Sequence, residues 1–554
     1  MKKTILYIIL ATLTSLFSNS CTKDFTSTNV DPSIISNVDV RFLFTTSLEN
    51  LQGNREWIWE DLEQLLRYSQ LLTSDPYELS GSVNNRYGAF YSAILPNLFE
   101  MRRLIDNKAD KDNFQKIYAA TYIIQVFQGL KVTDMNGSIP YTEANQGRDK
   151  GKYNPVYDTQ KVLYDTWIKE LSNSITVLEK DLANQESFGN NDIFYQGDWT
   201  KWAKLANSLK LRIAARYQNP DPAAATQIFK EVMADAVGPM SSIADQMTYS
   251  NTNYIPFGPT EIDYRSRRYA AENVVDFMKA TGDPRISIYY DKNSLVGDFK
   301  TALTANSVTL PSWINLDDPL VAFQGGPSDF GANGDKNKYF SNGVPVGSSK
   351  YNLISTINRR FFMPHLDGAN GQYIDVLVSY AEVCLNIAEF IQKGYGSAFD
   401  TKGTASDWYN KGVRASANTM NTIAIAAGSA SVASIDPLVD TYLTSPKVKL
   451  DGNNNLEKIY IQQLLNFYRQ GNEAFTLVRR TGFPKFNSTI LARETMPDMI
   501  PRRYWLLDPG EVNRANWNAA MTEEGFTPND RSAEKLSTER IWFDKNSPAF
   551  GAGN

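Results

Sequence analysis

The feature that most constrains the fold is a set of long stretches in which apolar residues recur at every third or fourth position. In 159–182, for example, Trp167, Leu171 and Ile175 fall on one stripe, and 199–217 repeats the pattern. This spacing matches the 3.6-residue period of an α-helix and gives each helix one apolar face. Asp198 stands directly before the second stretch, where a helix N-cap is expected. The sequence therefore predicts a mainly α protein.

The predicted helices follow one another in pairs. The pairs are 87–105 with 113–131, 159–182 with 199–217, 374–392 with 405–424, and 456–470 with 472–480. Small residues occur inside them, as in "LANSLKLRIAARY". Paired helices with small packing residues are typical of tetratricopeptide-like arrays, although long insertions prevent a fixed period here.

Residues 240–372 have a different composition, rich in Gly, Pro, Asn, Ser and aromatic residues. A segment of this length is too long for a simple connection, and long loops in compact proteins usually carry function or short structure of their own. We expect a helical scaffold that displays a loop-rich insertion with a few short β-hairpins.

Composition excludes several classes of function. The formal net charge of −5 argues against a nucleic-acid-binding protein, which needs a basic face. His365 is the only histidine, so serine–histidine catalysis and histidine-rich metal sites lack their residues, and we expect His365 to be structural. Cys384 lies in a helical pattern and is expected to be a buried, inert thiol. We expect no metal and no cofactor. The run "DGNNNLE" (451–457) resembles a calcium loop, but Leu456 replaces the required glycine, so we expect a turn before a helix.

The N-terminus has the features of an export signal. Lys2 and Lys3 precede an apolar segment, 5–13, that is too short to span a bilayer. A serine-rich stretch then leads to Cys21. We expect residues 1–20 to be a lipoprotein signal peptide, Cys21 to be lipidated and 21–35 to form a flexible stalk. The alternative is an ordinary signal peptide followed by a chance cysteine.

Ordered motifs along most of the chain resemble the SusD/RagB family of nutrient-binding outer-membrane lipoproteins, especially its second SusD-like subgroup. These motifs are "TDMNGSIPYTEA" (133–144), "YNPVYDTQKVLYDTW" (153–167), "YQGDWTKWAKLANSLKLRIAAR" (195–216), "YAEVCLNIAEF" (380–390), "WYNKGVRAS" (408–416), "GNEAFTLVRRTGFP" (471–484), "PRRYWLLDPGEVNRANWNAA" (501–520) and "IWFD" (541–544).

The resemblance implies a SusD-like fold over 36–554, treated as one domain whose insertion covers about 240–372. It implies a protein without catalytic residues that is anchored in the outer membrane and faces the extracellular side. Such proteins cap a SusC-like TonB-dependent transporter and deliver oligosaccharides, or in some members peptides, to it. Their four tetratricopeptide-like units face the transporter.

A sugar-binding surface needs flat aromatic faces for the C–H groups of the ring and planar polar side chains for its hydroxyls. Four loops provide this mixture, namely 54–64, 74–87, 251–269 and 311–318. The candidate ligand-binding residues are Tyr77, Asn84, Arg86, Tyr254, Tyr264, Arg268, Trp313, Trp57 and Trp59. We expect most of them to be exposed and clustered, and at least one of Trp57 and Trp59 to pack inward.

Two other functions remain open at this stage. The same fold could capture peptides instead of glycans. A helical glycoside hydrolase would need two carboxylates across a cleft, and Asp61 and Glu63 are the candidates, although no motif singles them out. Glu382 and Glu389 are more simply read as ion-pair partners of Arg479, Arg480 or another basic residue.

Overall fold

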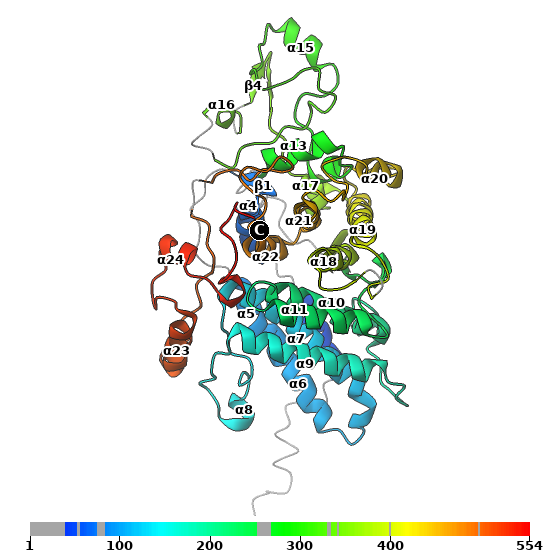
Figure 1. Cartoon of the computed structure of the whole chain (residues 1–554), viewed down its shortest axis with the longest axis vertical. Coiled ribbons are helices and arrows are strands. Elements are labelled where there is room, and N and C mark those ends of the chain that lie inside the picture. The colour runs from blue at the N-terminus through cyan, green and yellow to red at the C-terminus, as the bar shows by residue number, and fades with distance from the viewer. Residues whose placement is uncertain are drawn as a thin grey trace, which may run out of the picture.

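The computed structural model describes residues 39–51, 56–74, 84–251, 268–329, 334–340, 343–397, 400–496 and 499–553. Figure 1 shows the described chain as two stacked helical halves with a smaller lobe at the top. The prediction of a mainly α fold is confirmed.

The lower half in Figure 1 is built from helices of the first 234 residues. Its elements are α3 (Val40–Glu49), α5 (Asn85–Ala89), η2 (Phe90–Ile94), α6 (Leu95–Asp106), η3 (Lys111–Phe114), α7 (Gln115–Asn136), α8 (Gly147–Lys150), α9 (Gln160–Glu179), η4 (Gly189–Asn191), α10 (Trp199–Tyr217) and α11 (Pro222–Ala234). Their apolar faces form one core around Trp167, Trp202 and Leu209.

The upper half combines an early helix with later ones. Its elements are η1 (Glu56–Leu65), α4 (Leu66–Tyr68), α13 (Glu272–Thr281), α14 (Ile286–Tyr289), α17 (Arg359–Phe362), η6 (Leu366–Gly368), α18 (Tyr380–Gln392), α19 (Ala405–Ala426), α20 (Asp436–Tyr442), α21 (Asn455–Asn466) and α22 (Gly471–Thr481). A second core around Tyr289, Phe361 and Tyr468 holds them together. The C-terminal segment returns to the lower half through η7 (Glu511–Asn513), α23 (Arg514–Glu524), α24 (Ala533–Thr538) and η8 (Trp542–Asp544).

All four predicted helix pairs are formed. Helix α6 packs on α7, α9 on α10, α18 on α19, and α21 on α22. Local sequence starts several of these helices where expected. The Asp198 side chain accepts a hydrogen bond from the Lys201 backbone N–H and caps α10, as predicted, and Thr404 with Asp407 forms a capping box at α19. Residues 451–454 form bends directly before α21, so the predicted turn is confirmed.

One helix boundary was predicted wrongly. Residues 374–378, expected in a helix, belong to strand β6 (Tyr373–Val378), which pairs antiparallel with β2 (Met247–Asn251). The run "YIDVLV" is rich in β-branched residues, and its pairing partner stabilises an extended backbone. Helix α18 begins only after Ser379, whose hydroxyl accepts from the Glu382 N–H.

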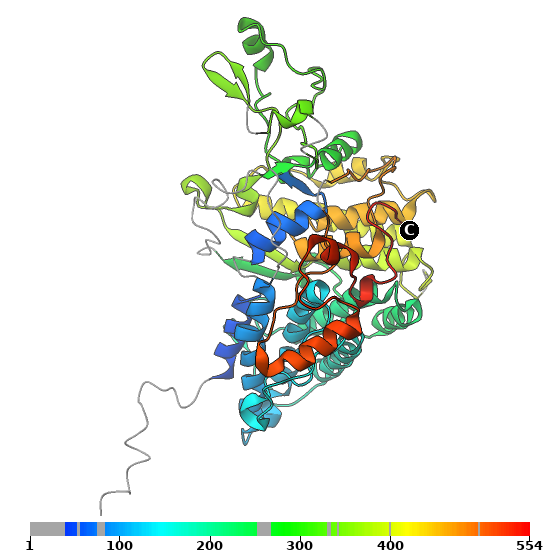
Figure 2. The same cartoon turned by 90° about the vertical axis from the view of Figure 1, so that its left-hand side faces the viewer.

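The insertion contains short structure, as expected. Strand β1 (Leu72–Ser74) pairs with β3 (Arg268–Ala270), and β4 (Val344–Val346) forms a hairpin with β5 (Ser349–Tyr351). This hairpin, α15 (Phe299–Ala305) and α16 (Gly334–Asn337) belong to the lobe that projects from the top in both views (Figures 1 and 2). A small core that includes Leu295, Phe299 and Leu353 stabilises the lobe. The short η5 (Ile243–Asp245) precedes β2.

Buried ion pairs join the two halves. Arg212 of α10 contacts Glu382 of α18 at 2.7 Å, and Arg216 contacts Glu473 of α22 at 2.7 Å. Within the upper half, Glu389 of α18 forms a two-pronged pair with Arg480 of α22 at 2.6 and 2.7 Å. Glu382 and Glu389 therefore have the structural role predicted for them. Cys384 is fully buried and His365 half-buried, with its Nδ1 3.3 Å from the Ala369 carbonyl oxygen.

Candidate functional site

The β1–β3 ribbon brings two of the predicted binding loops to one place. Ser74 pairs with Arg268, so the segments that follow β1 and precede β3 start from adjacent positions. Those segments are 75–83 and 252–267, and Tyr77, Tyr254 and Tyr264 fall within them, outside the described residues. We call the β1–β3 ribbon and its surroundings the loop junction.

A third predicted loop is fixed to the same ribbon by an ion pair. Glu63 of η1 lies 2.9 Å from the Arg268 guanidinium, and Arg268 is buried. Trp57, at the start of η1, is also buried and meets Phe362 edge-on, with ring centroids 5.3 Å apart. The expectation that Arg268 is exposed is therefore corrected, while Trp57 packs inward as expected for at least one of the two tryptophans. The Trp59 side chain lies outside the described part of the chain.

Arg86 is likewise an interior residue rather than an exposed one. Its guanidinium is fully buried and contacts Glu60 at 2.8 Å, Asp61 at 3.0 Å and the Asn472 amide oxygen at 2.5 Å. Charge neutralisation by two carboxylates is the usual requirement for burying an arginine. Arg86 thus connects η1 with α22 and does not present donors to a ligand at the surface.

Asn84 remains accessible at the edge of the loop junction. It is half-buried, precedes α5, and accepts a 3.2 Å hydrogen bond from Asn136 Nδ2. The carboxylates considered for a hydrolase are engaged elsewhere, since Asp61 is paired with Arg86 and Glu63 with Arg268. Both carboxylates are therefore held in buried ion pairs.

The fourth predicted loop contributes an aromatic group beside the junction. Trp313 is half-buried and meets Tyr339 with centroids 5.8 Å apart, and the Lys336 ammonium lies 5.1 Å from the centre of the Trp313 ring. Both aromatic rings pack against a cluster that contains Tyr269 of β3. The Trp313 indole N–H is buried without a hydrogen-bond partner among the described residues. Residues from all four predicted loops therefore meet around β3, although 56–64, expected as a loop, is helical and belongs to η1.

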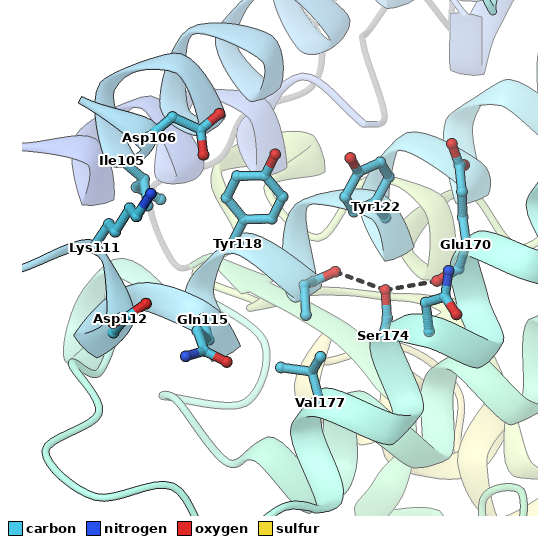
Figure 3. Close-up of a pocket in the computed structure, with 12 residues that line it drawn as sticks. Ile105, Asp106, Lys111, Asp112, Gln115, Tyr118, Tyr122, Glu170, Ser174 and Val177 are labelled. Atoms are coloured by element: carbon cyan, nitrogen blue, oxygen red, sulfur yellow. Dashed lines mark hydrogen bonds between the residues drawn. The ribbon is translucent and has the colours of Figure 1, made fainter. Parts of the chain in front are cut away.

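A separate cleft was not predicted. It lies between α6, α7 and α9 and consists of two adjoining cavities of about 450 and 770 Å³. Asp106, Tyr118, Tyr122 and Glu170 line both cavities. Figure 3 shows the two tyrosine rings rising from α7 beside Glu170 of α9. The signal in the sequence was the spacing of Tyr118 and Tyr122, which places two amphipathic aromatic residues one helical turn apart.

The described residues contain no group of three or more His, Cys, Asp or Glu side chains that could hold a metal ion. Among the described helices, none combines the length and the apolar character that a bilayer span requires.

Comparison with protein families identifies the chain. The family model of the second SusD-like group, described as "Starch-binding associating with outer membrane", matches residues 24–307 and 298–506. The chain belongs to this SusD-like family.

Solved structures agree with the SusD-like fold. A chitin-binding protein aligns over 92% of this chain and 100% of its own length, with a TM-score of 0.69 and 21% identity. A SusD homologue from Bacteroides fragilis covers the same shares at a TM-score of 0.66 and 22% identity. A chitin-binding SusD homologue from Flavobacterium johnsoniae has a TM-score of 0.64, 18% identity and coverage of 92% and 99%. A comparison with curated protein sequences finds no match.

Proposed function

We propose that this SusD-like protein is a lipid-anchored, non-enzymatic receptor at the cell surface that captures oligosaccharides and delivers them to a SusC-like TonB-dependent transporter. The observation that carries the proposal is the meeting of four aromatic- and amide-rich loops around β3, in a chain whose family is described as starch-binding and outer-membrane-associated. Two solved structures of the same fold are named as chitin-binding, which supports glycans as the ligand class.

Trp313 is the described residue best placed to contact such a ligand. Its ring is partly accessible, and Tyr339 and Lys336 hold it in position. Lys336 is itself paired with Glu272 of α13, which anchors this group to the body of the protein. An orientated indole supplies the flat apolar face that a sugar ring requires. Among residues outside the described part, Tyr77, Tyr254 and Tyr264 remain proposed contacts, since they belong to the two segments that leave the β1–β3 ribbon.

The absence of catalysis is proposed on chemical grounds. Glycoside hydrolysis needs two carboxyl groups free to face the scissile bond. At the loop junction Asp61 and Glu63 are held by buried arginines. We propose reversible capture with dissociation constants in the micromolar to millimolar range, about −8 to −4 kcal/mol, which permits release to the transporter.

An array of oligosaccharides and peptides, probed with the purified mature protein, tests the ligand class. The proposal expects oligosaccharides to bind without release of new reducing ends. Selective binding of peptides would show that the ligand is a peptide rather than a glycan. Release of new reducing ends would show that the protein is an enzyme. The anchor is tested separately by mass spectrometry of the N-terminal peptide, which should carry acyl chains on Cys21 and lose them in Cys21→Ala.

The role of Trp313 is tested by Trp313→Ala. We expect roughly a tenfold loss of affinity for an oligosaccharide bound by the native protein, since a lost aromatic contact of about 1.4 kcal/mol corresponds to that factor. Trp408→Ala is the matched control, because Trp408 is also half-buried beneath a lysine, with Lys411 at 4.4 Å, but lies on α19. Equal affinities of the native protein and Trp313→Ala would remove Trp313 from the site.

A further inference from the structure

The cleft between α6, α7 and α9 lies in the lower half of the molecule, whereas the loop junction belongs to the upper half. In Figure 1, α6 and α9 lie in the lower half of the structure, whereas β1 lies in the upper half, below the projecting lobe. The two cavities of this cleft, about 450 and 770 Å³, each fall in the usual size range of small-molecule sites. The cleft therefore cannot be an extension of the loop junction.

Two tyrosines form the floor at the point where the cavities meet. Tyr118 and Tyr122 are both half-buried, and their ring centroids lie 6.0 Å apart. Because they line both cavities, a ligand that occupies both must pass across their rings. This arrangement favours an elongated ligand over a compact one.

Buried groups beneath the cleft hold the rings in place. The Arg102 guanidinium lies 4.4 Å from the Tyr122 centroid and 4.6 Å from that of Phe99. Arg102 is only 6% exposed, and it donates to Thr121 and to Gln125 at 2.8 and 2.7 Å. A stacked arginine with satisfied donors limits the motion of the aromatic surface before a ligand arrives.

Polar groups surround this aromatic floor. The Glu170 carboxylate accepts a 2.5 Å hydrogen bond from the Tyr141 hydroxyl through Oε2, which leaves Oε1 available to the cleft. Asp106, Gln115 and Asn173 are exposed and line the smaller cavity. In Figure 3, Asp106 on α6 and Glu170 on α9 stand on either side of the tyrosines. Planar carboxylate and amide groups beside aromatic faces are the complement of a hydroxyl-rich ring.

The charge of the walls argues for a neutral ligand. The larger cavity is lined by Glu100, Arg103, Arg148 and Asp149, and Glu100 is paired with both arginines at 2.5 and 3.3 Å. No single sign of charge dominates, so neither a polyanion nor a polycation is favoured. The walls are helices and offer no free strand edge for an extended peptide.

We propose that the cleft between α6, α7 and α9 is a second carbohydrate-binding site, which takes a linear neutral oligosaccharide across Tyr118 and Tyr122. This second site goes beyond the proposed function because it is separate from the loop junction, although it rests on the same ligand class.

Hydroxyl-radical footprinting with mass spectrometry locates the ligand directly. The detergent-solubilised mature protein is labelled with and without maltoheptaose, cellohexaose, xylohexaose, mannohexaose and N-acetylchitohexaose. We expect at least one of them to protect Tyr118 and Tyr122, independently of any protection at Trp313. In Tyr118→Ala and in Tyr122→Ala, we expect about ten times more ligand to be needed to protect the remaining cleft tyrosine. Tyr118→Phe keeps the aromatic ring and should raise this ligand concentration far less.

The control is Tyr153→Ala, because Tyr153 is 70% exposed and does not line the cleft. It should leave all protection unchanged, and unchanged thermal unfolding of each variant checks the fold. Protection at the loop junction alone, with no effect of the tyrosine variants, would overturn the second site and leave the proposed function intact. If none of the five oligosaccharides protects any residue, both are contradicted. Protection of Tyr118 and Tyr122 by tryptic peptides but not by glycans would make the cleft a peptide site and overturn the inference.

Discussion

At the scale of single residues, buried charges connect segments that are far apart in the sequence. Glu389 is fully buried, and both of its oxygens accept hydrogen bonds from Arg480 on α22. Burial alone would raise the pKa of Glu389, but the Arg480 charge and hydrogen bonds hold it at about 2. A depressed carboxyl pKa contributes stability that is present above the ordinary value of about 4.5 and is lost as pH falls toward 2.

Removing this carboxylate should therefore be costly. Glu389→Ala leaves the Arg480 guanidinium buried without its partner, and we expect a loss of about 3–5 kcal/mol in the free energy of unfolding. Guanidinium chloride unfolding of the native protein and of Glu389→Ala at neutral pH measures this loss of stability. Asp317→Asn breaks an exposed pair with Lys300 and should change stability by less than about 1 kcal/mol. Similar small effects for both variants would show that the buried pair is not formed.

The pKa of Glu170 is shifted in the opposite direction to that of Glu389. Burial raises the pKa of Glu170 to about 7, although the Tyr141 hydrogen bond and the Arg102 charge oppose the shift. An acid with a raised pKa makes the folded state less stable as pH increases from about 4.5 through 7, because ionisation is then penalised only in the folded protein.

Glu170→Gln should remove this penalty. We expect the variant to gain stability relative to the native protein as pH rises from 5 to 8, by on the order of 1–2 kcal/mol at pH 8. Differences in the melting temperature measured across this interval test it, with Glu49→Gln, at an exposed position of α3, as the control. A difference that stays constant with pH would contradict the raised pKa.

Some of these residue roles could be predicted from the sequence, and others could not. Glu382 and Glu389 lie seven residues apart on one predicted helical surface, and this spacing favours ion pairs with basic residues over acid–base chemistry. Arg86 lies in a polar run that predicts a binding loop, but the structure buries it against Glu60 and Asp61, 26 and 25 positions earlier, and against Asn472, 386 positions later. Such a remote contact leaves no local signal, and the same reason explains Arg268.

At the scale of elements, close helix packing depends on glycine at particular positions. A Cβ atom at Gly129 of α7 would lie 2.8 Å from the Trp167 ring of α9. Gly88 of α5, by contrast, has open space around the corresponding position. The contact between α7 and α9 therefore leaves no space for a side chain at Gly129, whereas α5 has space for one at Gly88.

Alanine substitutions should separate these two cases. Gly129→Ala forces a rigid indole ring to move, and we expect a loss of about 1–3 kcal/mol. Gly88→Ala meets nothing and should gain about 0.5–1 kcal/mol from its higher helix propensity. Denaturant unfolding measures both, and equal effects of the two changes would contradict the packing of α7 against α9.

Helices were predictable as elements because their apolar period is long and repeated. Strand β6 was not, because its six residues directly precede α18 and share the apolar character of that helix. What fixes the strand is pairing with β2, a segment more than 120 residues earlier, with Asn251 opposite Tyr373. Pairing partners at such separation are not readable from one sequence.

At the scale of the whole molecule, two helical halves are joined by buried ion pairs. The upper half carries the loop junction and the lower half carries the tyrosine-lined cleft (Figures 1 and 2). The predicted binding loops do converge, but parts of 54–64, 74–87 and 251–269 lie outside the described residues. The cleft was missed because it forms between helices that are separate in the sequence.

The measurement that tests this account most directly is affinity isolation of the native, tagged protein from solubilised outer membranes, with an oligosaccharide that it binds present in the buffer. We predict that a TonB-dependent transporter is isolated with it in near-stoichiometric amount. Recovery of the protein without such a transporter, or from a soluble cytosolic fraction, would contradict the account.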